Sequence, residues 1–366
     1  MYQHDNRIVI TLDAGGTNFV FGAMQANQLI IDPITLPSLS HDLDRCLHQL
    51  TSGFEQVIAQ LQEQPVAISF AFPGPADYPN GIIGGYLPNF PSFRDGVALG
   101  PMLESRFGIP VFINNDGDLF AFGEALAGKL PEVNRRLAEL GSTKQYKSLI
   151  GYTFGTGFGI GHVYDGRLHL GDNACVETFC LRHKHHPGII AEEGVSVRAV
   201  KRIYAELSGS DEALEPKDIF SIAEGQRSGN RDAAIQAFAT LGEVAGDAIA
   251  TAITLLDGMV VVGGGLTAAR KYIMPALLRE LRGTMRTLGG EELPRVQVKV
   301  YDLDSDAELA QLAKGEQRQL QVYGTDRYVT YDPQKRVGVG ISDIGASMAI
   351  SVGAYSYALS QIDRQQ

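Results

Sequence analysis

The sequence contains few cysteines. Only Cys46, Cys175 and Cys180 occur in 366 residues, too few for a disulfide scaffold in a chain of this length. The first residues, MYQHDNR, are polar and lack the apolar segment of a secretory signal. We therefore expect a cytoplasmic protein.

Positive charge is also scarce. Lys and Arg number 31 against 42 Asp and Glu, which gives a net charge of -11. This acidic balance leaves no basic surface for DNA, RNA or an anionic membrane. Glycine or proline interrupts the longest apolar runs before they reach the roughly 20 residues that span a bilayer. We therefore expect neither nucleic acid nor a membrane as a partner.

Apolar residues, in contrast, make up 44% of the chain, enough for a large core and for two domains. The first half begins with the strand RIVITL, a glycine turn and two more short strands. An amphipathic helix follows, with an apolar stripe from Leu43 to Leu61. The strands VAISFAF and PVFINND come next, and the second leads into the helix GDLFAFGEALAG.

The second half repeats this layout. KSLIGYTFGTGFGIGHVYDGRLHLG predicts a strand, a glycine turn and two further strands. Mostly helical sequence from Val195 to Asp257, the strand MVVVGG and a helix from about Asp343 complete it. We expect an α/β protein with domains at residues 1–118 and 119–366 around a cleft, the last helix being able to pack back on the first domain.

Each half has a glycine turn between its first two strands. Glycine lets backbone N–H groups approach an anion closely, so phosphate is the natural occupant. Asp13, at the end of the first strand, is placed to hold Mg²⁺ through water. A tight hairpin turn would explain one such motif, but not a pair. The residues expected to contact phosphate are Gly15, Gly16, Thr17, Gly155, Thr156 and Gly157.

A third glycine stretch, VVVGGGLTAAR, has two interpretations. Gly263, Gly265 and Ala268 fit the dinucleotide fingerprint, which would indicate an oxidoreductase. However, the stretch comes late in the chain, and no strand ending in an acidic residue follows about 20 residues on. We interpret Gly263, Gly264 and Gly265 as a floor for the adenine and ribose.

Together these motifs resemble the ROK family of repressors and sugar kinases. The ordered set is DAGGT, FPGPAD, LPNFP, NND, GTGFGIG, VET and VVVGGGLT, and it spans nearly the whole chain. The resemblance implies a duplicated actin-like (ribonuclease H-like) ATPase fold and a homodimer. It also implies ATP- and Mg²⁺-dependent phosphorylation of a hexose or amino-hexose. The sugar, its reacting hydroxyl and the choice of ATP over polyphosphate stay open.

The resemblance assigns Asp116 of NND as the catalytic base. A sugar hydroxyl has a very high pKa, and a carboxylate within reach can take its proton as the bond to phosphorus forms. Asn115 or Asp116 can equally cap the following helix, and the two roles are compatible. The resemblance assigns the sugar-binding residues as Gly74, Asn89, Asn115, Asp116, Glu177 and Glu192.

The stretch ETFCLRHKHHPGIIAEEG departs from the family pattern. Many relatives have a histidine where Cys180 stands, followed by a cysteine-rich loop that binds structural zinc. Cys180, His183, His185 and His186 could rebuild a tetrahedral site. Adjacent histidines rarely point at one ion, and an exposed polar loop explains them equally well, so we expect no zinc site.

A second departure is an insertion at about residues 303–337. Its segment LQVYGTDRYVTYDPQKRVGVGI predicts two strands joined by a turn at DPQK. The insertion could be a hairpin added at the edge of the sheet without a function, a flap over the cleft or a dimer contact.

Two functions from different classes remain: a hexose kinase, and a non-catalytic sugar-binding sensor or regulator on the same fold. A family repressor needs a helix-turn-helix, for which the start of the first strand near Arg7 leaves no room. Asp13 and Asp116 are both present, which favours the kinase.

Overall fold

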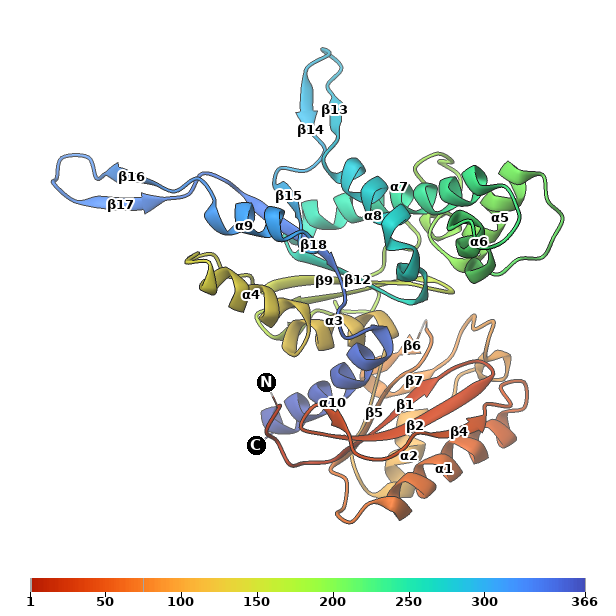
Figure 1. Ribbon diagram of the computed structural model, residues 1–366. Helices are drawn as coiled ribbons and strands as arrows, with labels where there is room; N and C mark the ends of the chain where they lie inside the picture. The colour runs from red at the N-terminus through yellow and green to blue at the C-terminus, as the bar shows by residue number, and fades with distance from the viewer. Residues whose placement is uncertain (1, 75, 366) are drawn as a thin grey trace. The chain divides into compact units, whose positions relative to one another are not determined.

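Two compact units make up the chain. The structure is a computed structural model that describes residues 2–74 and 76–365 (Figure 1). The first unit holds the residues up to Lys129, the segment Ile160–Val176 and the residues from Asp343 on; the second holds Leu130–Gly159 and Glu177–Ser342. These units are not the contiguous ranges expected from sequence. The last helix belongs to the first unit, as the sequence allowed, and Ile160–Val176 also belongs to it, which was not expected.

A six-stranded sheet forms the centre of the first unit. Its order is β3-β2-β1-β5-β8, and β4 pairs with β2. β1 is antiparallel to β2 and parallel to β5, which is parallel to β8, so the carboxyl ends of β1, β5 and β8 share one edge. The strands are β1 Val9–Ala14, β2 Asn18–Gln25, β3 Gln28–Leu29, β4 Ile34–Pro37, β5 Ala67–Ala71 and β8 Val111–Asn114, with a small pair β6 Ala76–Asp77 and β7 Ile82–Ile83.

Helices cover both faces of this sheet. Ile68 and Phe70 of β5 point into the core that also contains Phe54 of α1, whereas Ala67 and Ala71 point into the clusters with residues of α10. This alternation is the period of two expected of a strand buried on both faces. The helices are α1 Leu43–Gln60, α2 Leu99–Phe107, α3 Asp116–Leu126 and α10 Ala346–Gln365.

α3 and α10 cross at close range through glycines. A Cβ on Gly123 would overlap the carbonyl of Ala349, and a Cβ on Gly353 would overlap the carbonyl of Leu119. Bare backbone on both helices therefore allows the close approach. As a consequence, α10 supports the helix that carries Asp116 at its first position.

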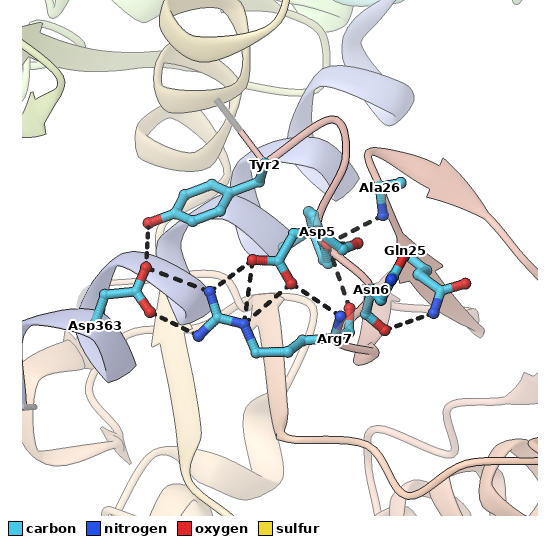
Figure 2. A network of polar contacts seen from close by, with 8 residues as sticks. Tyr2, Asp5, Asn6, Arg7, Gln25, Ala26 and Asp363 are labelled. Atoms are coloured by element: carbon cyan, nitrogen blue, oxygen red, sulfur yellow. Dashed lines mark hydrogen bonds and ion pairs between the residues drawn. The ribbon is translucent and has the colours of Figure 1, made fainter.

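A polar network joins the start of the chain to the end of α10 (Figure 2). Arg7 forms ion pairs with Asp5 at 2.7 Å and with Asp363 at 2.6 Å. The Tyr2 hydroxyl donates to Asp363, and burial together with this carboxylate raises the pKa of Tyr2 to about 12. The side chains of Arg7 and Asp363 are partly exposed, so each pair adds only about 0.2–1 kcal/mol.

The second sheet repeats the arrangement of the first. Its order is β11-β10-β9-β12-β18-β15, so β9, like β1, lies between the second strand of its meander and a parallel strand. β18 runs parallel to both β12 and β15. The duplication predicted from the sequence is therefore present. The strands are β9 Ser148–Phe154, β10 Phe158–Tyr164, β11 Arg167–Leu168, β12 Met259–Gly263, β15 Lys299–Asp302 and β18 Arg336–Ile341.

One helix of the second unit corrects a sequence expectation. α7, Arg231–Leu256, is long and apolar enough by length and composition to cross a membrane, although no such run was expected. It packs against α5, α6 and α8, and 56% of its apolar window is buried, as in the core helix of a globular protein. The other helices are α4 Lys129–Glu139, α5 Val197–Ser208, α6 Pro216–Ala223, α8 Arg270–Leu281 and α9 Asp306–Lys314.

The insertion contains a hairpin, but the predicted turn is wrong. β16 Arg318–Gln321 pairs with β17 Tyr328–Tyr331, so the turn lies at residues 322–327. The DPQK segment instead leads from β17 into β18, a fully buried strand of the main sheet. Apolar residues occur along both β17 and β18, so the sequence alone does not show which of the two strands belongs to the main sheet. In Figure 1 this hairpin extends away from α9, and a second hairpin, β13 Thr284–Arg286 with β14 Glu292–Pro294, was not predicted.

Candidate active site

Asp13 lies at the carboxyl edge of the first sheet. It is in β1, beside Ala71 of β5 in the parallel register. Its side chain is exposed to solvent, yet partial desolvation by the surrounding protein raises the pKa of the carboxyl group. A carboxylate in this position suits a cation that keeps most of its water, as Mg²⁺ does.

The first glycine turn is held from two sides. The Gly16 carbonyl accepts hydrogen bonds from the hydroxyls of Ser38, at 2.5 Å, and Ser40, at 3.1 Å. A Cβ on Gly16 would come within 2.9 Å of the Cβ of Asn89. The turn and a predicted sugar-binding residue are therefore in contact, and only glycine fits between them. Thr17, exposed at the next position, completes the turn.

The NND motif ends β8 and begins α3. Asn115 is the N-cap, and its Oδ1 accepts the Gly117 N–H at 2.7 Å, which confirms the capping interpretation. Asp116 Oδ1 accepts the same N–H at 2.9 Å. A Cβ on Gly117 would lie 2.5 Å from the carbonyl of Ile160, so the first turn of α3 rests directly on β10.

Asp116 is exposed to solvent as a residue, but many protein atoms lie around its carboxylate and partly desolvate it. Desolvation by the surrounding atoms raises its pKa, the hydrogen bond from Gly117 opposes this, and the charge of Asp13 raises it further. The net direction is upward. Asp13 and Asp116 are thus close enough for their charges to interact, as two acidic groups of one site would be.

Gly74 follows β5 in the same unit. A Cβ there would come within 2.6 Å of the Tyr78 hydroxyl, which donates to the Phe72 carbonyl at 2.9 Å. The loop therefore folds back over Tyr78, and glycine is needed for this close approach. The first unit thus gathers six of the predicted positions at or beside the carboxyl edge of its sheet: Asp13, Gly15, Gly16, Gly74, Asn115 and Asp116.

The second unit contains the other glycine turn, at residues 155–157. The Gly155 N–H donates to Gly157, and the Gly155 carbonyl accepts the Val197 N–H at 2.8 Å, which attaches the turn to the start of α5. Glu192 Oε2 accepts the Phe158 N–H at 3.0 Å and would lie 2.9 Å from a Cβ on Gly157. A predicted sugar-binding carboxylate therefore lies directly on the predicted phosphate turn.

The third glycine stretch lies beside this turn. Gly263 is the parallel partner of Thr153, and Gly264 has a φ of 96°, where a Cβ would overlap the backbone of Phe154. Gly265 is exposed and begins a short 3-10 helix ahead of α8. The ends of β9 and β12 thus present the second and third glycine stretches together.

The segment from Glu177 to Glu192 forms a compact loop. Glu177 is half-buried, and the Glu192 N–H donates to the Phe179 carbonyl at 3.2 Å. His183 is buried, with its Nδ1 accepting the backbone N–H of His185 at 3.1 Å and its Nε2 facing Gly194. Desolvation and the neighbouring histidines lower the pKa of His183.

These contacts give His183 a packing role. Within residues 2–74 and 76–365, no group of three or more His, Cys, Asp or Glu side chains is arranged to hold a metal ion. The zinc alternative at Cys180, His183 and His185 thus gains no support, and zinc content stays a prediction to be measured.

Sequence reasoning missed three supporting residues. Ser38 and Ser40 brace the first glycine turn, but they lie in a loop without a motif. Arg198 bonds Glu192, six residues before it, and Glu193. Arg198 is five residues from Glu193, which is not a helical pair spacing, so the sequence offered no signal for this contact.

Comparison with known proteins agrees with the motif order. The model of the ROK family matches residues 9–300. The solved structure of a glucokinase from Parabacteroides distasonis is 60% identical, covers 98% of this chain and 99% of its own, and superposes with a TM-score of 0.90.

Two curated enzymes are more distant relatives. A glucokinase of Thermotoga maritima is 25% identical, covering 74% of this chain and 85% of its own. The N-acetylgalactosamine kinase AgaK of a Shewanella species is also 25% identical, over 80% of this chain and 92% of its own. The duplicated sheets, the carboxylates at their edges and these matches agree: the chain belongs to the ROK family and is an ATP-dependent sugar kinase with the actin-like ATPase fold.

Proposed function

We propose that the enzyme phosphorylates a hydroxyl of a hexose or amino-hexose, with Asp116 as the general base. The observation that carries this proposal is the Asp116 carboxylate at the start of α3, with a raised pKa and within electrostatic reach of Asp13. A base of raised pKa takes a proton more readily than an ordinary aspartate does. The relatives named glucokinase make glucose the first sugar to test, and the amino-sugar kinase makes the N-acetylated hexoses the second.

In this mechanism each residue has a defined task. Asn89, Asn115, Glu177 and Glu192 hold the sugar hydroxyls, since each buried hydroxyl left unpaired costs about 1–3 kcal/mol. Asp116 takes the proton of the reacting hydroxyl while its oxygen bonds to the γ-phosphorus. The bond from that phosphorus to the bridging oxygen breaks, and ADP leaves with the electron pair.

The nucleotide side of the proposal uses both glycine turns. The N–H groups of Gly15, Gly16 and Thr17 and those of residues 155–157 would bind the phosphates, and residues 263–265 would support the adenosine. The donor set at Asp13, one accessible carboxylate beside a phosphate turn, fits Mg²⁺. When bound, Mg²⁺ neutralises charge on the phosphates.

We further propose that the kinase acts in the cytoplasm as a homodimer. The thiols of Cys46, Cys175 and Cys180 are free, as is usual in a reducing compartment. The sensor alternative is not favoured, because both acidic groups of the kinase mechanism are present.

The test is a screen for ADP release over hexoses and amino-hexoses, followed by two substitutions. Asp116→Asn keeps the size of the side chain but removes its basicity. We expect kcat to fall at least about a hundredfold while sugar affinity changes little. Activity within tenfold of the parent enzyme would show that Asp116 is not the base.

Asp13→Asn is the matched control for the acidic pair. It weakens the proposed Mg²⁺ site rather than the proton transfer, so raising Mg²⁺ should restore part of its activity. The same titration should not rescue Asp116→Asn. If no sugar stimulates phosphoryl transfer in the parent protein, the proposed kinase reaction is wrong.

A further inference from the structure

Arg198 occupies the first turn of α5, beside the glycine turn of the second unit. Its Nη2 lies 2.7 Å from Glu192 Oε1 and 2.8 Å from Glu193 Oε1. Its Nε also donates to Glu193, and its Nη1 approaches the Thr156 carbonyl at 3.5 Å. The guanidinium is thus placed directly at the turn that the proposed function assigns to phosphate.

The turn, Glu192 and Arg198 form one connected cluster. Glu192 uses its second oxygen on the Phe158 N–H, and Val197, the residue before Arg198, donates its N–H to Gly155. Both ends of the turn are therefore held by the short segment from Glu192 to Val197, which leads into α5. Backbone hydrogen bonds hold the glycine turn, whereas the Arg198 side chain is 48% exposed, so a ligand in solvent can reach its guanidinium group.

The guanidinium group of Arg198 has donor capacity for a further acceptor. A guanidinium carries five N–H donors, and the 3.5 Å contact to Thr156 is too long to satisfy Nη1. Arginine matches phosphate oxygens with two parallel hydrogen bonds, which a lysine cannot do. Two carboxylates now pair with this cation, and a nucleotide, which carries several negative charges, competes with each of them for it.

We propose that Arg198 binds the phosphates of the nucleotide, exchanging its bonds to Glu192 and Glu193 for phosphate oxygens. This inference rests on the proposed function, since it assumes that residues 155–157 face the nucleotide. It adds a residue outside the glycine motifs. It also makes Glu193 a competitor that weakens nucleotide binding.

Calorimetric titration of the full-length enzyme with a non-hydrolysable ATP analogue and Mg²⁺ tests the proposal. Arg198→Gln should weaken analogue binding about tenfold or more, because a charge-assisted bidentate contact is lost. Arg202→Gln is the matched control. Arg202 lies one turn further along α5 and contacts Glu206 and the Glu193 carbonyl, so its loss should leave the affinity within twofold.

A second variant tests the competition and does not depend on the first. Glu193→Gln removes one of the two carboxylates that hold Arg198, so analogue binding should strengthen twofold to fivefold. Unchanged or weaker binding by Glu193→Gln, or an affinity within twofold of the parent in Arg198→Gln, overturns the proposal. Should Arg198→Gln fold poorly, Arg198→Lys should bind with intermediate affinity, because lysine supplies only a point charge.

These titrations need no sugar, which separates the two proposals. If the parent binds the analogue and the variants behave as expected, but no sugar is phosphorylated, the kinase mechanism fails and the role of Arg198 stands. If sugar is phosphorylated but Arg198→Gln keeps the parent's KM for ATP, the role of Arg198 fails and the kinase mechanism stands.

Discussion

At the scale of single residues, Asp116, the proposed general base, lies in an environment that disfavours its charged form. Desolvation raises its pKa, and Asp13 adds to this, while the Gly117 N–H only partly compensates. The native state therefore favours the protonated form more than the unfolded chain does. A group with a raised folded pKa contributes stability that is present below its unfolded pKa and is lost as the pH rises through its folded pKa.

This sign predicts how Asp116→Asn changes stability. At pH 7 the substitution removes a charged carboxylate whose desolvation costs free energy in the folded state. The ligand-free variant should therefore have a higher melting temperature than the parent. The difference should vanish as the pH falls below about 3.9, where the parent carboxyl is protonated in both states. Thermal melts between pH 3.5 and 8 check this, and a variant less stable than the parent at pH 7 would contradict it.

At the scale of elements, the contact between α3 and α10 positions the helix that carries the proposed base, Asp116. Gly123 and Gly353 let the two helices approach until backbone meets backbone. Gly117 does the same where α3 meets β10. Three glycines therefore fix the direction of α3, and with it the location of Asp116, more firmly than the local capping bond to Asn115 alone would.

Gly353→Ala should disturb both stability and activity. Its Cβ would meet the Leu119 backbone, which cannot move aside as a flexible side chain could, so we expect a loss of about 1–3 kcal/mol in the free energy of unfolding. Activity should fall as well, because α3 shifts. Denaturant unfolding and steady-state kinetics measure both. Gly188→Ala, where a Cβ meets nothing within 4 Å, should change neither.

At the scale of the whole molecule, the β16–β17 hairpin, like the β13–β14 hairpin, contributes no buried residue to the core. Every residue of its two strands is exposed, and a lone two-stranded hairpin is marginally stable in water. It presents the large side chains of Tyr323, Tyr328 and Val329 to solvent. Residues 317–331 carry two arginines and one aspartate on a chain of net charge -11. A slightly basic, aromatic arm of this kind suits the acidic surface of a second copy.

Replacing residues 318–331 by a short glycine-containing turn should therefore abolish the proposed self-association. The melting temperature of the monomer should stay within a few degrees, since no buried residue is removed. Sedimentation or light scattering gives the mass, and kinetics give the activity. A dimer of unchanged affinity with a reduced kcat would instead favour a flap, the other interpretation that the sequence permits.

Much of the fold follows from sequence patterns because those patterns are local. Alternating apolar residues and glycine turns predicted both three-stranded meanders, and the apolar stripe from Leu43 to Leu61 predicted α1. The residue types at the sheet edges were also predictable, because the motifs stand in one order at fixed intervals. The hairpin turn was misplaced at DPQK, since β18 and the hairpin strands share the same alternation and differ only in burial.

The sequence by itself determined the duplicated plan, the family, and which positions are glycine or carboxylate. Tertiary structure alone decided that α10 joins the first unit, that Gly16 contacts Asn89, and that Arg198 reaches both Glu192 and the turn at residues 155–157. The physical reason is range. Strand period, helix stripe and turn chemistry act over a few neighbours, whereas these contacts join residues whose proximity exists only once the sheets have formed and the helices have packed on them.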